Sequence, residues 1–165
     1  MYFDAFQGLD QYKTELDRVA PELEASPHIL IVGNGGSSAM ASHMAVDLLL
    51  LGKLASALTD PAVVTALTND FCYEDIYARQ IGLWPKGGSL IAISSSGNSQ
   101  NIVNAVMAAK MLDYYIVTFS GFNRPNNLCS LGHVNIHVPF TDYGIVESSH
   151  AVLLHYLINK MKGEE

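Results

Sequence analysis

Cysteine, tryptophan and basic residues are all scarce in this chain of 165 residues. Its 2 cysteines, Cys72 and Cys129, are too few for a disulfide framework and lack the close spacing of zinc ligands. Lysine and arginine number 9 against 16 acidic residues, the net charge is -7, and no basic cluster is present. Nucleic acid is therefore not an expected partner. An acidic protein that binds phosphate must use backbone amides, hydroxyl groups and helix dipoles instead.

Long hydrophobic runs are also missing. The apolar run over residues 45–51 is interrupted by Asp47 and is too short to span a bilayer. The first residues lack the basic start and the long apolar core of a secretion signal. The sequence therefore predicts a cytoplasmic protein with no membrane partner. Its hydrophobic content of 49% suits one compact domain with a filled core.

Short apolar segments alternate with helical segments along most of the chain. Strands are predicted over residues 28–32, 54–58, 89–93, 115–119 and 134–138, and helices over 38–50, 61–68, 73–83, 100–112, 126–131 and 145–161. Such alternation is typical of an α/β fold, here a three-layer αβα sandwich with a five-stranded parallel, doubly wound (flavodoxin-like) sheet. Residues 1–25 are predicted to form a helix that ends at or shortly after Pro21 and serves oligomerisation. Residues 26–165 are predicted to form the single α/β domain.

Two loops rich in small residues follow the first and third predicted strands. They read Gly33-Asn34-Gly35-Gly36-Ser37-Ser38 and Ser94-Ser95-Ser96-Gly97-Asn98-Ser99. Each loop precedes a helix, so backbone amides, serine hydroxyls and the helix N-terminus can bind an anion there. Tight turns with helix-capping serines would look similar. Two loops of one layout favour the two halves of one phosphate site beyond the carboxyl ends of the strands.

Ionisable side chains interrupt two apolar helices. His43 and Asp47 are four residues apart on one helix face, and Glu147, His150 and His155 lie in the last helix. A buried carboxylate is costly unless it is paired or metal-bound. These residue types suit zinc ligation, acid–base catalysis, or satisfied pairs in the core or at a subunit contact. Their spacing does not choose between these roles.

Together these motifs resemble the sugar-isomerase (SIS) domain, and more narrowly its phosphoheptose isomerase branch. The resemblance rests on both loops, His43, residues 58–61 and residues 69–74. It implies a phosphosugar isomerase that is a homotetramer or homodimer, with sites at subunit interfaces and no organic cofactor. The implied reaction converts sedoheptulose 7-phosphate to D-glycero-D-manno-heptose 7-phosphate through an enediol, for bacterial envelope polysaccharide.

The resemblance also implies roles for individual residues. Those expected to bind the substrate and its phosphate are Asn34, Gly35, Ser37, Asp70, Ser94, Ser95, Ser96 and Ser99. Either Asp47 or Glu147 is the expected base and His155 is the expected acid. Together with His43, these residues are the expected ligands where a zinc ion is bound. Asp47 replaces the family's usual glutamate, and Glu147 replaces its usual glutamine. Two alternatives therefore stay open: a regulator of the type that binds the replication initiator, and an isomerase of another sugar phosphate.

Overall fold

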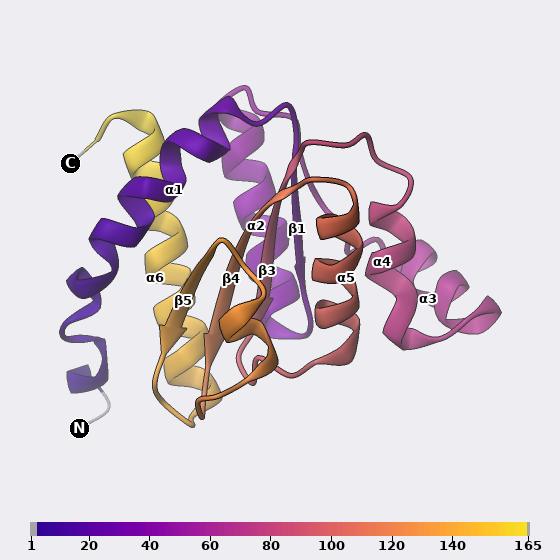
Figure 1. The fold of residues 1–165 in the computed structure, drawn as a ribbon. Coiled ribbons are helices and arrows are strands. Elements are labelled where there is room, and N and C mark those ends of the chain that lie inside the picture. The colour runs from indigo at the N-terminus through magenta and orange to yellow at the C-terminus, as the bar shows by residue number, and fades with distance from the viewer. Residues whose placement is uncertain (1–2, 165) are drawn as a thin grey trace.

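Five parallel strands form one sheet in the order β2-β1-β3-β4-β5 (Figure 1). The structure, a computed structural model, describes residues 3–164, so the predicted ranges 1–25 and 26–165 extend beyond it at residues 1, 2 and 165. The strands are β1 (Ile29–Gly33), β2 (Ala55–Ala57), β3 (Ser89–Ser94), β4 (Tyr115–Gly121) and β5 (Val134–Val138). This confirms the predicted parallel sheet.

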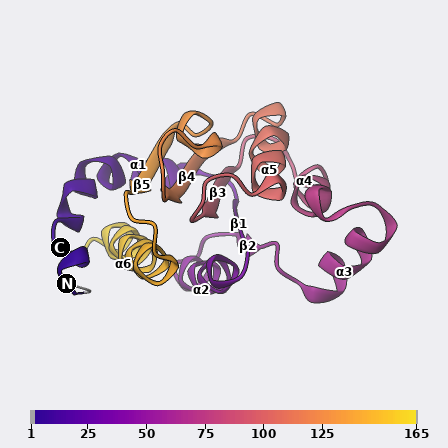
Figure 2. The same cartoon turned by 90° about the horizontal axis from the view of Figure 1, so that it is seen from below.

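Helices cover both faces of the sheet. On one face lie α1 (Lys13–Ala25), α2 (Gly36–Leu50) and α6 (Tyr143–Lys162), and on the other lie α4 (Ile76–Ile81) and α5 (Gln100–Met111). Every residue of β1 and β3 is buried, as expected for central strands covered on both sides. The helix α3 (Pro61–Asp70) has no buried residue and projects beyond β2 (Figure 2). Within residues 3–164, no helix has the length and apolar character needed to cross a bilayer.

The N-terminal segment is not the single helix that the sequence predicts. It begins with two 3-10 turns, η1 (Phe3–Phe6) and η2 (Leu9–Tyr12). Between them Gly8 adopts a left-handed conformation with φ of 81°, which interrupts the helix. The α-helix then runs through Pro21 to Ala25 and packs against α6 of the same chain.

Two other predicted helices also differ in detail. The segment predicted over 73–83 divides into a 3-10 turn, η3 (Tyr73–Asp75), and the short helix α4. The segment predicted over 126–131 is a 3-10 turn, η4 (Asn127–Ser130), in which the Asn126 side chain accepts a hydrogen bond from the backbone amide of Cys129. Short polar segments of this kind favour side-chain bonds to the local backbone over a longer helix.

The direction of winding reverses between β1 and β3. These strands pair in parallel, with Gly33 opposite Ile93. From β1 the chain continues to the edge strand β2, and from β3 it continues the other way to β4 and β5. A crevice is expected beyond the carboxyl ends of two such strands, and both small-residue loops lie there.

Candidate active site

A polar pocket of about 210 Å³ lies where the two loops meet. We call it the serine pocket. It is lined by Asn34, Gly35, Ser37, Ile93, Ser94, Ser95, Ser96, Ser99, Tyr143 and Glu147. The structure therefore brings together every residue predicted to bind the substrate except Asp70.

The polar groups of the serine pocket do not cap the helices that follow the two loops. The N-cap residues of α2 and α5, Gly35 and Ser99, make no side-chain cap bond. Instead the Ser94 hydroxyl lies 3.2 Å from the Ser99 hydroxyl and 3.5 Å from that of Ser96. The Ser95 hydroxyl is buried without a hydrogen-bond partner among residues 3–164. Hydroxyls and uncapped amides therefore gather at one place, which suits an anion and not the capping alternative.

Glycine at the start of α2 allows close approach of α6. Gly35 has φ of 54° and ψ of -124°, a backbone conformation that side chains rarely permit. A Cβ atom on Gly36 would lie 2.3 Å from Oε2 of Glu147. The Glu147 carboxylate therefore reaches the first turn of α2. It has no hydrogen-bond or ion-pair partner among the described residues.

A second group of polar side chains lies further along α2 and α6. His43, Asp47 and His155 form what we call the His–Asp–His cluster. Oδ2 of Asp47 is 3.6 Å from Nε2 of His43 and 3.8 Å from Nδ1 of His155, and the imidazole rings meet edge to face. These side chains are 62%, 23% and 54% exposed for His43, Asp47 and His155. The cluster is therefore partly open to solvent in the single chain, although it lies on two helices that are otherwise apolar.

The cluster has the donors and spacing of a metal site. One ligand atom from each residue lies within 4.8 Å of the others. A tetrahedral zinc ion with ligands at about 2.0–2.1 Å separates its ligand atoms by about 3.3–3.5 Å, close to the distances around Asp47. Two imidazoles and a carboxylate are typical zinc ligands and leave a fourth position for water or substrate. Glu147, the fourth predicted ligand, lies in the serine pocket and outside this group.

The serine pocket and the cluster lie along the same pair of helices. The cluster lines a second cavity of about 200 Å³, whose other walls are the apolar side chains of Ala39, Met40, Met44, Ala151, Leu154 and Ile158. Glu147 and His155 are separated by eight residues, or about 12 Å along the axis of α6. The two sites are thus the ends of one seam between α2 and α6.

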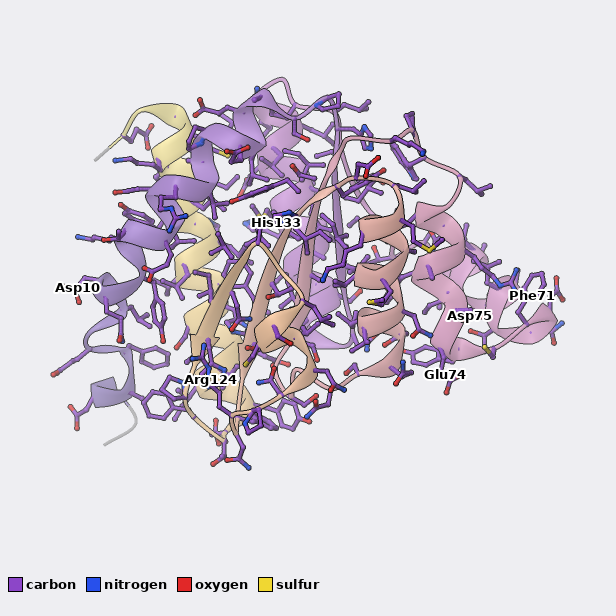
Figure 3. All side chains as sticks on the ribbon, in the orientation of Figure 1. Asp10, Phe71, Glu74, Asp75, Arg124 and His133 are labelled. Atoms are coloured by element: carbon purple, nitrogen blue, oxygen red, sulfur yellow. The ribbon has the colours of Figure 1, made fainter. Side chains whose placement is uncertain are left out.

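Asp70 lies apart from both sites. It is the last residue of the projecting helix α3, is exposed, and accepts a hydrogen bond of 2.9 Å from the side chain of Asn69. In Figure 3 its neighbour Phe71 marks the tip of this projection, far from the labelled Asp10 of the N-terminal segment. Asp70 lines neither the serine pocket nor the cavity at the cluster. Its contact with the substrate stays a prediction.

Sequence reasoning missed several residues at the serine pocket. Tyr143 lines the pocket one helical turn before Glu147 on α6. This spacing places both side chains on one helix face and could have identified Tyr143 from the sequence. The side chains of Asn101 and Tyr73 bond to the Asn34 side chain. By contrast, His150 is fully buried and bonds to the carbonyl oxygen of Ser120, so it belongs to the core.

Fold and site define a doubly wound α/β protein with a hydroxyl-lined pocket at its switch point and a His–Asp–His cluster beside it. The sequence profile of the SIS domain matches residues 10–121. The chain is 36% identical over 143 residues to the phosphoheptose isomerase of Shewanella sp. (strain ANA-3), which covers 81% of this chain and 73% of the relative.

Solved structures agree with this match. The fold superposes on phosphoheptose isomerase from Neisseria gonorrhoeae with a TM-score of 0.90 and 29% identity, covering 98% of this chain and 93% of that one. For the enzyme from Francisella tularensis the values are 0.83 and 25%, with coverage of 96% and 95%. The chain therefore belongs to the SIS-domain family, as a phosphoheptose isomerase-like phosphosugar isomerase.

Proposed function

We propose that this cytoplasmic enzyme converts sedoheptulose 7-phosphate to D-glycero-D-manno-heptose 7-phosphate through an enediol. Relatives in Shewanella, Neisseria and Francisella that carry the name phosphoheptose isomerase support this substrate. The observation that carries the proposal is the seam between α2 and α6, with the serine pocket at one end and the His–Asp–His cluster at the other.

The length of the seam supports a long sugar phosphate. The six carbon–carbon bonds of a heptose, at about 1.5 Å each, extend over about 8 Å, and the phosphate adds about 2–3 Å. This total is close to the axial distance of about 12 Å between Glu147 and His155. A heptose phosphate held in the serine pocket is therefore long enough to extend along the seam to His155, with C1 and C2 between Glu147 and His155. A triose phosphate would fall short of the cluster.

The serine pocket would hold the phosphate. The donors would be the hydroxyls of Ser37, Ser94, Ser95, Ser96 and Ser99 with the uncapped amides of α2 and α5. A fixed phosphate orients the carbon chain of the substrate along the seam. The reacting carbons and the acid and base are then held in position for proton transfer.

The cluster and Glu147 would carry out the proton transfers. Glu147 has no hydrogen-bond or ion-pair partner within residues 3–164, so it is available to remove the proton next to the carbonyl group and return it to the neighbouring carbon. Nδ1 of His155 faces Asp47, which leaves Nε2 to protonate the carbonyl oxygen. Asp47 lies between two imidazoles, as a ligand or an orienting group would, so we assign the base role to Glu147.

Zinc fits the cluster, with His43, Asp47 and His155 as its ligands. Bound there, it would polarise the substrate oxygens at C1 and C2. Since Glu147 is not among these ligands, its role as a base does not compete with metal binding.

We also propose that the enzyme is a homo-oligomer, a tetramer or dimer, whose contacts border the site. The apolar side chains of Val46, Leu49 and Leu50 on α2 are 52%, 51% and 81% exposed. They lie on the helix that carries His43 and Asp47. A second subunit on this surface would shield the exposed cluster from solvent.

Isomerase assays on purified protein test the proposal. The substrates are sedoheptulose 7-phosphate and ketose phosphates of five and six carbons, with and without added zinc. We expect the heptose to be preferred, and Glu147→Gln and His155→Ala to lower kcat by about 10²–10⁴-fold. Asp47→Asn should lower zinc affinity, whereas Glu147→Gln should leave it unchanged.

His133→Ala is the matched control, because His133 is exposed just before β5, at the other edge of the sheet. Full activity of His155→Ala would contradict the assignment. Binding of the sugar phosphates without turnover would favour a regulator, and a preference for a shorter ketose would favour another isomerase.

A further inference from the structure

Asn34 and Asn101 join the two halves of the serine pocket by a pair of reciprocal amide hydrogen bonds. Nδ2 of Asn34 donates to Oδ1 of Asn101 over 2.9 Å, and Nδ2 of Asn101 donates back to Oδ1 of Asn34 over 2.8 Å. Asn34 belongs to the first loop, and Asn101 is 2% exposed in the first turn of α5, directly after the second loop. The spacing of the two loops is therefore set by side chains as well as by the sheet.

Two tyrosines from a third part of the chain hold the first loop as well. The Tyr73 hydroxyl donates to Oδ1 of Asn34 over 3.0 Å, and the Tyr77 hydroxyl donates to the carbonyl oxygen of Gly33 over 2.6 Å. Burial raises the pKa of Tyr77 to about 12, so this hydroxyl keeps its proton. The segment of η3 and α4 thus also contacts the loop.

These bonds fix which way the Asn34 amide faces. Its Oδ1 has two acceptor sites, which Asn101 and Tyr73 fill at 2.8 and 3.0 Å, and the Tyr77 hydroxyl lies 3.4 Å from the same oxygen. Its Nδ2 has two hydrogens, of which Asn101 takes one. Asn101 is itself oriented, because its Oδ1 also accepts from the backbone amide of Ile102. The second N–H of Asn34 is therefore the polar group left for a ligand in the pocket that this residue lines.

We propose that Asn101, Tyr73 and Tyr77 are positioning residues that hold the first loop in its binding conformation and orient the free N–H of Asn34 toward the phosphate. With Asn34 they form what we call the loop clamp. The inference rests on the phosphate site proposed above. Three of the four residues from Gly33 to Gly36 are glycines, so this loop would otherwise lose much conformational freedom on binding. The clamp lowers that cost before the ligand arrives.

Two conservative variants test the clamp. Asn101→Asp keeps the shape and the acceptor but removes the donor to Asn34, and Tyr73→Phe removes one hydroxyl from a side chain that is 46% exposed. The matched controls are Asn159→Asp, which adds the same charge on the exposed side of α6, and Tyr156→Phe, which removes a hydroxyl that bonds to Asp17.

The first measurement is amide hydrogen exchange over residues 33–38 of the full chain without ligand. We expect about 3- to 10-fold faster exchange in both clamp variants and no change there in the controls. The second is the Kd of inorganic phosphate by calorimetry, which should rise by about 3- to 10-fold in the clamp variants. Adding Tyr73→Phe to Asn34→Ala should not weaken phosphate binding further, since the hydroxyl then has no amide to orient.

Unchanged exchange over residues 33–38 in both clamp variants would overturn the inference, whatever their phosphate affinity. If exchange over residues 33–38 is faster in the clamp variants but the wild-type protein binds no phosphate, the clamp is supported and the phosphate site is wrong. The failure of the clamp and the failure of the proposed function are therefore distinguishable.

Discussion

Burial separates the histidines of this protein into two groups. His43 and His155 are exposed beside Asp47, where their ring nitrogens are accessible. His150 is fully buried, and its Nε2 donates to the carbonyl oxygen of Ser120 over 3.0 Å. Its Nδ1 is buried without a hydrogen-bond partner among the described residues, as suits an unprotonated nitrogen. His150 therefore contributes to stability in its neutral form.

We expect acid to destabilise the fold through His150. Burial lowers the pKa of His150 from 6.5 to about 4, so between these pH values the unfolded state binds the proton more strongly. This stability is present above pH 6.5 and is lost as the pH falls toward 4, a change of about 3 kcal/mol. Urea unfolding at several pH values measures it. The free energy of unfolding of His150→Gln should depend less on pH, and parallel profiles for the two proteins would contradict the prediction.

The sequence predicted positions best where they depend on one loop. The serines of both loops line one pocket, as expected for two loops that follow neighbouring parallel strands, and their role in binding phosphate stays a prediction. Asp70 and Glu147 could not be placed in this way. The position of Asp70 depends on how α3 projects from the sheet, and that of Glu147 depends on how α6 packs against α2. No local pattern records such packing.

At the scale of elements, the strands were predicted well because buried parallel strands are apolar on both faces. All five coincide with predicted segments to within a few residues. The N-terminal helix was predicted less well. Its apolar residues keep helical spacing across Gly8, but the left-handed backbone of Gly8 interrupts the helix. Periodicity also cannot show whether an apolar helix is covered. On α2 the apolar side chains of Val46, Leu49 and Leu50 are exposed, although the helix is apolar along most of its length.

The contact between α2 and α6 at Gly36 gives a prediction at this scale. In Gly36→Ala the new methyl group would meet the Glu147 carboxylate, which lies 2.3 Å from the Cβ position. Because this carboxylate ends a flexible side chain, it should move and the protein should still fold. We expect kcat to fall at least about 10-fold while the melting temperature changes little, since the base is displaced. Gly82→Ala, whose Cβ would be 3.5 Å from its neighbours, is the control, and an unchanged kcat in Gly36→Ala would contradict this role of Glu147.

At the scale of the whole molecule, the terminal helices cover each other. Leu16 and Leu23 of α1 and Leu153 and Leu157 of α6 are buried within the chain. In Figures 1 and 2 the two helices lie side by side. The apolar face of α1, which lies in the segment predicted to serve oligomerisation, is therefore largely covered within the chain. The exposed apolar residues of α2 are better candidates for a subunit contact, and oligomerisation through residues 1–25 stays a prediction.

The α2 surface predicts how assembly and activity are linked. Leu50 is 81% exposed and lies two turns from His43 on the same helix. In Leu50→Glu a charge would have to be buried in the contact, so we expect the oligomer to dissociate and isomerase activity to fall with it. Sedimentation velocity gives the mass of each protein at the assay concentration. Leu83→Glu, at a leucine that is 88% exposed after α4, should keep both mass and activity. A wild-type monomer with full turnover would show that the site is complete in one chain.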